Sequence, residues 1–502
     1  MPTQSVEDFV SSLKLCAQEA TSLKDVLATQ GSPTNDVETA CKAAQIILGP
    51  EVVEAAPING TEVEKNWSKT CWESPACIIR PKAAHHVAIT LKIIAHFEVP
   101  FSVRSGGHSP NPGFSSIDRA GLLIDLSSLD HITVGDDGES VSIGPGQRWG
   151  NVYSELDKLG LAVFGARVPN VGVGGLLLGG GFFHFSAQYG LAADNVKEYE
   201  VVLADGTITT ASVTKNHDLF WALKGGGPNF GIVTRYDLHT VPVRHVWYEI
   251  MSVSNSEAHA VLDAFVRWQE TSAATDTKGT VVLLMGIHDI TLAFLYSEPA
   301  AKRPAGFAAF DNLKTTATMV PPTNGTVHTL VQCFSSTSFD TARHDYRAAA
   351  SRIDVQLYKD VYDFWLGQAA AAKAATGATQ IFTLQPIPAQ LAEAGRARGG
   401  NPMGIPAENH TWWTTLVDWE RAADDDEVRR VSIATASKWK ELGEKRGLHL
   451  DYLFINDASR DQNPLSTYGE ENIGKLKAVS AKYDETQVFQ KLQHNGFLLG
   501  KI

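Results

Sequence analysis

The spacing of apolar residues changes along this chain and divides it into parts. From residue 76, the runs "ACIIRP", "AAHHVAITLKIIAHF" and "PFSVR" have the patterns of a strand, a helix and a strand, which is the order of a βαβ unit. After Pro242 the glycine-rich stretches end, and strand-like runs alternate with alanine-rich helices as far as residue 447. That pattern predicts an antiparallel sheet flanked by helices, so the expected fold class is α+β.

Individual elements follow from the same patterns. Residues 5–30 place apolar residues at helical spacing and predict one amphipathic helix packed on the body. The pair Asp205-Gly206 lies between alternating apolar residues and predicts a β-hairpin. Four runs in the second part predict strands, namely "WYEIMSVS", "TVVLLMGIHDITLAFLYS", "TLVQCFSS" and "HTWWTTLVDW".

Composition and charge narrow the classes of partner. The chain has 502 residues and a formal net charge of −13, so it is long enough for two or three domains but lacks the basic surplus that nucleic acids attract. No run reaches the roughly 18 to 20 apolar residues of a membrane span, and the first residues do not resemble a signal peptide. We therefore expect a small-molecule substrate, no nucleic-acid or membrane partner, and a cytoplasmic location in preference to a secreted one.

Five cysteines leave at least one thiol unpaired within the chain. Cys71 and Cys77 lie close together in "TCWESPACIIRP", and they either close a small disulfide loop or remain two packed thiols. The pair His85-His86 lies in a predicted helix without the spacing of metal ligands, so no metal site is expected.

Three glycine-rich loops are the strongest chemical signal in the sequence. They span residues 105–113, 172–181 and 225–231, and each adjoins predicted strands. Leu177 stands where a dinucleotide fingerprint counted from Gly172 needs its third glycine, and neither G-x-x-x-x-G-K-[ST] nor G-x-S-x-G is present. Separate glycine-rich loops suit a long ligand that contacts the backbone amides of each loop, with a diphosphate near the first loops. FAD is such a ligand.

Four runs from residue 66 onward carry a family resemblance: "PFSVRSGGHSPNPGF", "VPNVGVGGLLLGGGFFHFSAQYGLAADNV", "DLFWALKGGGPNFGIVTRYDLHTVP" and "YGEENIGKLKAVSAKYDETQVFQ". They resemble the berberine-bridge-enzyme-like branch of the vanillyl-alcohol-oxidase flavoprotein superfamily, in particular its fungal members. The resemblance implies a two-part FAD-binding domain of the PCMH type formed by residues 66–242 and 448–502. It also implies a substrate domain at 243–447 and an N-terminal helical segment at 1–65 packed on the FAD domain.

The resemblance further implies how FAD is held. His108 would carry the flavin through a bond to its 8α-methyl group, which is reasonable chemistry because neutral imidazole is a nucleophile. Many relatives have a second link from a cysteine, and Val168 takes that place here, so a single covalent link is expected. Val171 matches a site where a small side chain leaves O2 a path to the flavin, which favours an oxidase. The predicted cofactor-binding residues are Arg104, Ser105, Gly106, Gly107, His108, Ser109, Val168, Val171, Gly172, Gly174, Gly175, Val196, Gly231, Ile232, Val233 and Asn456.

Candidates for acid–base chemistry come from the resemblance and from strand alternation. The family's usual Asn-Tyr-Ala reads "NDA" here, so Asn456 would bond the pyrimidine edge of the flavin and Asp457 replaces a tyrosine. Alternation along residues 410–419 puts Asp418 on one face with Trp412. Either aspartate is a candidate base if burial raises its pKa, and an ordinary solvated or ion-paired carboxylate is the alternative. The predicted catalytic residues are Asp457, Asp418, Tyr452 and His184.

Three functions are compatible with these residues. The leading hypothesis is a covalent FAD oxidase that passes the electrons of a secondary metabolite, alcohol or sugar to O2. The second is a flavin-containing cyclase or isomerase of fungal secondary metabolism, with or without net redox chemistry. The third is a flavin-binding protein whose pocket has lost its activity.

Overall fold

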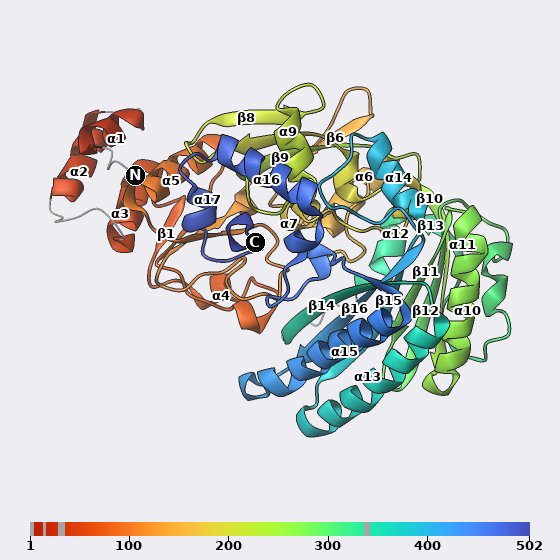
Figure 1. Ribbon diagram of the computed structural model, residues 1–502. Helices are drawn as coiled ribbons and strands as arrows, with labels where there is room; N and C mark the ends of the chain where they lie inside the picture. The colour runs from red at the N-terminus through yellow and green to blue at the C-terminus, as the bar shows by residue number, and fades with distance from the viewer. Residues whose placement is uncertain (1–4, 14–16, 29–35, 336–341) are drawn as a thin grey trace.

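The chain is described by a computed structural model that covers residues 5–13, 17–28, 36–335 and 342–502. Two parts lie side by side (Figure 1). One part contains two small sheets and both ends of the chain, and the other is built on one eight-stranded sheet with long helices against it. This combination of helices with parallel and antiparallel sheets confirms the predicted α+β class.

The first small sheet contains the predicted βαβ unit. Strands β2 (Cys77–Ile79) and β3 (Phe101–Arg104) both run parallel to β4 (Leu122–Asp125), and helix α5 (Ala84–Phe97) connects β2 to β3. β1 (Val53–Ala55) adds an antiparallel strand at the edge of β2. Every residue of β2 and β4 is buried, as expected of parallel strands covered on both faces. The first glycine-rich loop begins where β3 ends.

The second small sheet is antiparallel throughout, in the order β5-β6-β9-β7-β8. β7 and β8 form the hairpin predicted at Asp205-Gly206, where Gly206 has φ +83°, in the left-handed region that glycine tolerates best. The strands are β5 (Ile132–Val134), β6 (Ser140–Ile143), β7 (Val196–Val202), β8 (Ile208–Ser212) and β9 (Ile232–His239). Helices α6 (Trp149–Lys158), α7 (Val173–Leu178) and α9 (His217–Leu223) belong to the same part (Figure 1).

The eight-stranded sheet has the order β13-β10-β12-β11-β15-β16-β14-β17. Helices α10 (Ala258–Glu270), α13 (Val355–Thr376) and α15 (Asp425–Arg446) pack on one face and share a hydrophobic cluster with it (Figure 1). The strands are β10 (His245–Ser254), β11 (Gly279–Met285), β12 (Asp289–Tyr296), β13 (Thr315–Thr326), β14 (Arg343–Arg352), β15 (Thr379–Ile387), β16 (His410–Trp419) and β17 (His449–Leu450).

β16 shows the predicted alternation between the two faces of this sheet. Trp413 lies in the helix-side cluster, with its ring 6.1 Å from that of Trp439. Trp412 points to the opposite face and stacks on Phe454 at 4.6 Å, in the cluster that continues into the first part. One face of the sheet therefore packs on helices, and the other faces the two small sheets.

Three sequence predictions need correction. Residues 5–30 form two helices, α1 (Val6–Ser12) and α2 (Ala17–Ala28), where one was predicted, and residues 14–16 between them lie outside the described part. The run "TLVQCFSS" was predicted as a strand but contributes to helix α12 (Val327–Gln332), which is capped by Thr326. β14 was missed because its sequence "RHDYRAAASR" is rich in charge and alanine.

The last part of the chain returns to the first glycine-rich loop. After helix α16 (Glu470–Tyr483) and the short helix α17 (Val488–Lys491), Gln493 forms a parallel bridge with Phe101 of β3. The backbone N–H of His494 donates to the carbonyl of Phe101 over 2.7 Å. Residues close to the C-terminus thus support the strand that leads into the loop.

The disulfide pairs neither of the two neighbouring cysteines with the other. Cys77 bonds to Cys41 of helix α3 (Val37–Leu48), which joins that helix to β2. Cys71 is a buried free thiol that donates to the carbonyl of Ser109 over 3.3 Å. Of the two alternatives for Cys71 and Cys77, the small disulfide loop is therefore wrong, and Cys77 has a partner 36 residues away that the sequence did not indicate.

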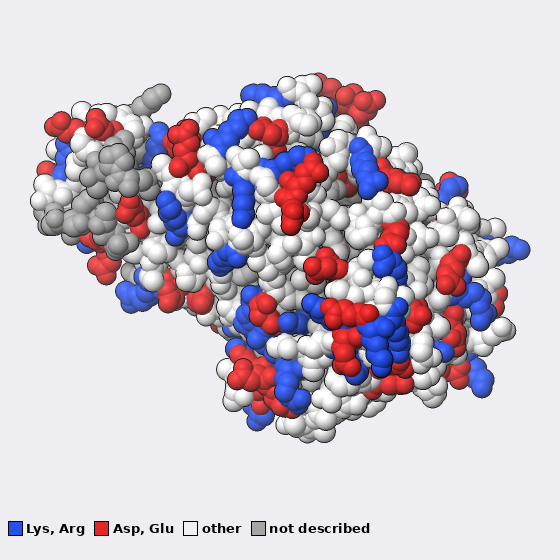
Figure 2. All heavy atoms as spheres, in the orientation of Figure 1, with Lys and Arg blue, Asp and Glu red and all other residues white. Residues whose placement is uncertain are grey.

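The surface shows no concentration of one charge on the face drawn in Figure 2, where basic and acidic side chains are mixed. None of the helices in the described ranges is both long enough and apolar enough to span a lipid bilayer.

Candidate functional site

A cavity of about 470 Å³ lies between the glycine-rich loops and the open face of the large sheet. Its loop side includes residues 105–111, and its sheet side includes Tyr346 of β14, Thr383 of β15 and Thr414 of β16. The two parts of the fold therefore enclose one continuous space.

Arg104 fixes the start of the loop but does not line the cavity, in contrast to the prediction that it contacts a diphosphate. Its buried guanidinium forms an ion pair with Asp125 at 2.7 Å and donates to the carbonyl of Glu62 at 2.8 Å. A buried guanidinium needs such partners because desolvation of an unpaired charge is costly. The pKa of Asp125 is lowered by the Arg104 charge, although burial alone would raise it.

The backbone of the loop offers free hydrogen-bond donors. The N–H groups of Gly106, Gly107 and His108 donate to no group in the described part of the chain. Gly107 has φ +61°, and a Cβ on Gly106 would lie 2.4 Å from the Cα of Gly172, so these positions require glycine. Successive free N–H groups beside a cavity form a site for an anion such as a phosphate.

Most of the predicted cofactor-binding residues line this cavity. They are Ser105, Gly106, Gly107, His108, Ser109, Val168, Val171, Gly172, Gly174, Gly175, Gly231, Ile232, Val233 and Asn456. Arg104 and Val196 do not. Val196 begins β7, pairs with Leu238 and is buried in the core, and its contact with the cofactor stays a prediction.

Asn456 lines the cavity and also connects two glycine-rich turns. Its side-chain oxygen accepts from the N–H of Gly181 over 2.9 Å, and its amide nitrogen donates to the carbonyl of Gly175 over 3.5 Å. The predicted bond to a flavin edge stays a prediction.

His108 is held in a stack of rings at the junction of loop and sheet. Its imidazole lies parallel to Trp67 at 4.3 Å, and Trp67 stacks on His344 of β14 at 3.7 Å. The hydroxyl of Tyr346 is 3.5 Å from Nδ1, while Nε2 is buried and has no hydrogen-bond partner in the described chain. Burial, and after it the charge of Arg148, lowers the pKa of His108 to about 3. The imidazole is therefore neutral and keeps a nucleophilic nitrogen.

The residues of this site fit FAD. The free N–H donors suit the diphosphate, and the cavity extends from them to the sheet. His108 lies between the two, and its Nε2 has no partner in the described chain. Among the residues that the structure describes, no group of three or more His, Cys, Asp or Glu could hold a metal ion.

Two of the predicted catalytic residues do not reach the cavity. Asp418 accepts a hydrogen bond from His344 Nδ1 at 2.6 Å, and one face of the His344 ring is covered by Trp67, which stacks on it. Asp418 does not line the cavity. Burial raises the pKa of Asp418 although its contact with His344 opposes this. Tyr452 is buried against Trp412 with ring centroids 5.3 Å apart. Alternation along β16 correctly puts Asp418 on the face of the sheet that carries Trp412. At the Asp418 end of the strand, however, Trp67 and His344 lie between the carboxylate and the cavity.

The other two predicted catalytic residues line the cavity. Asp457 accepts a hydrogen bond from Gln385 Nε2 at 2.7 Å, and burial raises the pKa of its carboxyl group. The Nε2 atom of His184 is buried and has no partner among the described residues. Burial, assisted by the charge of Arg167, lowers the pKa of His184 well below its usual value, so this imidazole is neutral.

Sequence reasoning missed four residues of the site, namely Trp67, Arg167, His344 and Tyr346. His344 and Tyr346 lie on β14, which was not predicted. Their spacing of two residues, which puts both side chains on one face of a strand, was therefore not recognised. Arg167 precedes the predicted Val168 by one position, and its charge within a run of apolar and glycine residues was the available signal.

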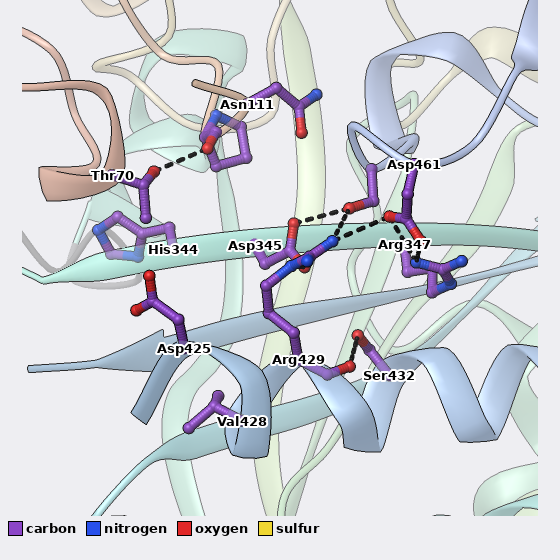
Figure 3. Close-up of polar contacts among 12 residues, drawn as sticks. Thr70, Asn111, His344, Asp345, Arg347, Asp425, Val428, Arg429, Ser432 and Asp461 are labelled. Atoms are coloured by element: carbon purple, nitrogen blue, oxygen red, sulfur yellow. Dashed lines mark hydrogen bonds and ion pairs between the residues drawn. The ribbon is translucent and has the colours of Figure 1, made fainter. Parts of the chain in front are cut away.

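An ionic network fixes β14 to the segment that carries Asp457 (Figure 3). Arg429 of α15 contacts Asp345 and Asp461, both at 2.9 Å, and Arg347 contacts Asp461 at 2.9 Å. Thr70 also donates to the carbonyl of Pro110 over 2.8 Å. These contacts hold the loop, the strand and the 457–461 segment in one arrangement.

Comparison with known proteins agrees with this geometry. A family model described as FAD binding domain matches residues 75–212. The FAD-dependent monooxygenase AOL_s00215g279 of Arthrobotrys oligospora is 39% identical over 436 residues, which are 87% of this chain and 84% of that protein. The chain belongs to the fungal berberine-bridge-enzyme-like flavoproteins. The bifunctional solanapyrone synthase of Alternaria solani is 34% identical, over 88% of this chain and 84% of that protein.

A solved structure shows the same fold. The glucooligosaccharide oxidase of Acremonium strictum superposes with a TM-score of 0.76 at 19% identity, covering 90% of this chain and 98% of that one. The matching family model and the Arthrobotrys oligospora relative make this berberine-bridge-like protein an FAD-binding oxidoreductase. The predicted family and the binding of FAD are confirmed, and the covalent link stays a prediction.

Proposed function

We propose that this flavoprotein is an oxidase whose FAD is attached to His108 and that oxidises a small organic molecule, with O2 as the electron acceptor. The observation that carries the proposal is the single cavity in which the free donors of residues 106–108, the neutral His108 and the open face of the large sheet meet.

A single covalent link fits the side chains around the cavity. Val168 and Val171 line it, and the described lining contains no cysteine. Cys71 lies behind Ser109, and burial raises the pKa of its thiol to about 12, so it is not a nucleophile. The Acremonium strictum protein is described as carrying a 6-S-cysteinyl, 8α-N1-histidyl FAD, and the present chain has only the histidine available.

When bound, FAD would supply the acceptor for two electrons of the substrate and their route to O2, with hydrogen peroxide as the reduced product. Asp457 is the residue that can take the substrate proton, because it lines the cavity and its raised pKa matches a general base better than an ordinary carboxylate does. Gln385 orients one oxygen of that carboxylate by donating to it.

The covalent link can be tested by precipitating the purified protein with trichloroacetic acid. We expect yellow colour and flavin fluorescence to stay in the pellet, and peptide mass mapping to place the flavin on His108. The variant His108→Ala should release its flavin into the supernatant. His184→Ala is the matched control, because His184 is a second neutral histidine of the same cavity, and it should keep the flavin bound. Release of all flavin from the wild-type chain would contradict the proposal.

A cyclase or isomerase is the second candidate. The sheet side of the cavity is largely apolar, with Val282, Leu284, Ile381 and Leu416 in its lining, which suits a hydrocarbon-rich substrate. The relative from Alternaria solani is named a bifunctional synthase. Oxygen uptake with peroxide formation indicates the oxidase, whereas a product of unchanged mass without oxygen uptake indicates the isomerase.

A further inference from the structure

We propose that Arg167 binds an acidic oxygen of the substrate, a carboxylate or an enolate, and thereby selects anionic substrates. The inference rests on the proposed function because it assigns a substrate class to the same cavity. It concerns a residue that neither the sequence motifs nor the relatives' names single out.

Arg167 is one of only two residues with a formal charge at neutral pH in the described cavity lining, and Asp457 is the other. Its guanidinium forms no ion pair and no hydrogen bond with another described residue. It lies over the ring of Phe182, 5.0 Å from the centroid. Arg104, by contrast, is fully paired with protein groups. A guanidinium enclosed by protein without a counter-ion is ready to bind an anion through paired N–H groups.

The position of Arg167 points to substrate rather than to the phosphates of the cofactor. Arg167, Phe182 and His184 also line a small recess of about 10 Å³ against β11 and β15. The rest of that recess consists of residues 280–283 and 383–386, and no residue of the 105–111 loop belongs to it. The charge therefore faces the sheet side of the cavity, away from the donors that suit the diphosphate.

No described neighbour of Arg167 forms an ion pair with it. Asp457 lies beyond ion-pair distance, accepts from Gln385, and has a raised pKa caused by burial. His184 is neutral because burial and the Arg167 charge lower its pKa. Burial lowers the pKa of Arg167, and the carboxylate charge of Asp457 opposes this shift. A guanidinium stays protonated at neutral pH in proteins, so Arg167 keeps its positive charge.

The test compares two probes of nearly equal shape, 2-naphthoate and 2-naphthamide, on the flavin-loaded enzyme. Affinity is measured by calorimetry and by the change in the flavin absorption spectrum. A charge-assisted pair should favour the carboxylate by about 10- to 100-fold over the amide. Arg167→Gln should remove that preference while leaving the affinity for the amide within about threefold. Arg167→Lys keeps the charge without the planar fork and should retain part of the preference.

Asp457→Asn is the matched control, because it removes the one negative charge of the cavity lining. It should tighten the binding of 2-naphthoate, a shift opposite to that of Arg167→Gln. Each variant is checked for acid-stable flavin, so that loss of the cofactor is distinguished from loss of anion binding.

Two results would overturn the inference. A wild-type enzyme that binds both probes equally would show that Arg167 does not select anions, whether or not Arg167→Gln folds. Loss of flavin from Arg167→Gln, with Arg167→Lys retaining it, would assign the guanidinium to the cofactor instead. Both results are independent of the proposed oxidase, whose own failure would appear as wild-type protein without acid-stable flavin.

Discussion

Asp457 combines the features needed for a general base. Its carboxylate lines the cavity, accepts from Gln385 at 2.7 Å and has a pKa raised by burial. The structure gives Asp418 a different role, because His344 occupies one of its oxygens and Trp67 lies between His344 and His108. Asp418 therefore supports the ring stack on which the orientation of His108 depends.

We expect Asp457→Asn to lower kcat by about 10²- to 10⁴-fold, the usual contribution of a general base, without loss of the covalent flavin. The wild-type kcat should fall as the pH decreases through the raised pKa of Asp457, because only the ionised carboxylate accepts a proton. Steady-state turnover per bound flavin across pH measures both effects. Asp418→Asn serves as the control and should keep this acid limb, and an unchanged acid limb in Asp457→Asn would exclude Asp457 as the base.

β14 was not predicted, yet it is the strand that brings the large sheet to the loop of residues 105–111. His344 and Tyr346, on one face of β14, reach Trp67 and His108, while Asp345 and Arg347 join the ionic network with Arg429. A strand of charged and alanine residues is stable here because its polar side chains are paired across the interface. The backbone of β14 forms hydrogen bonds with its neighbouring strands β16 and β17.

Helix α3 is tied to β2 by the Cys41–Cys77 disulfide, across a sequence separation of 36 residues. Closing a loop of this length stabilises a folded domain by about 2–4 kcal/mol. We expect Cys41→Ser and Cys77→Ser to lower the free energy of unfolding by that amount, measured by chemical denaturation. The control Cys71→Ser keeps the disulfide and should retain the linked peptide in a non-reducing digest. A peptide that links Cys71 to Cys77 would contradict this pairing.

The folded chain buries several neutral histidines, which makes its stability depend on pH. His410 donates from Nδ1 to the carbonyl of Glu408 and accepts from Trp412, so the fold holds it in the uncharged form. Burial lowers the pKa of His410 to about 4, and it also lowers the pKa of His184 well below its usual value. Below pH 6.5 the unfolded chain takes up protons that the folded chain does not, so stability falls as the pH decreases.

For His410 this loss extends from pH 6.5 to about 4 and amounts to about 1.4 kcal/mol for each pH unit. We expect His410→Gln to reduce stability at pH 7, and the difference from the wild type to shrink as the pH is lowered. Urea denaturation at pH 7, 6 and 5 measures the difference. A difference that stays constant over this range would show that His410 is not held neutral in the fold.

Much of the fold and of the cofactor site follows from patterns local in the chain. The βαβ unit, the hairpin at Asp205-Gly206 and the two faces of residues 410–419 depend on the periodicity of apolar residues, and each is present. The bare loop around His108 could be recognised because positive φ and close backbone approach restrict those positions to glycine.

The sequence by itself therefore determined the fold class, the cofactor and the glycine-rich loop that lines the cavity, since these depend on backbone requirements that act over a few residues. Only the tertiary structure decided that Arg104 is paired and Arg167 is not, that Cys77 bonds to Cys41, and that Asp457 lines the cavity while Asp418 does not. Charge pairing, burial and covalent partners are properties of neighbours in space, and those neighbours come from segments far apart in the chain.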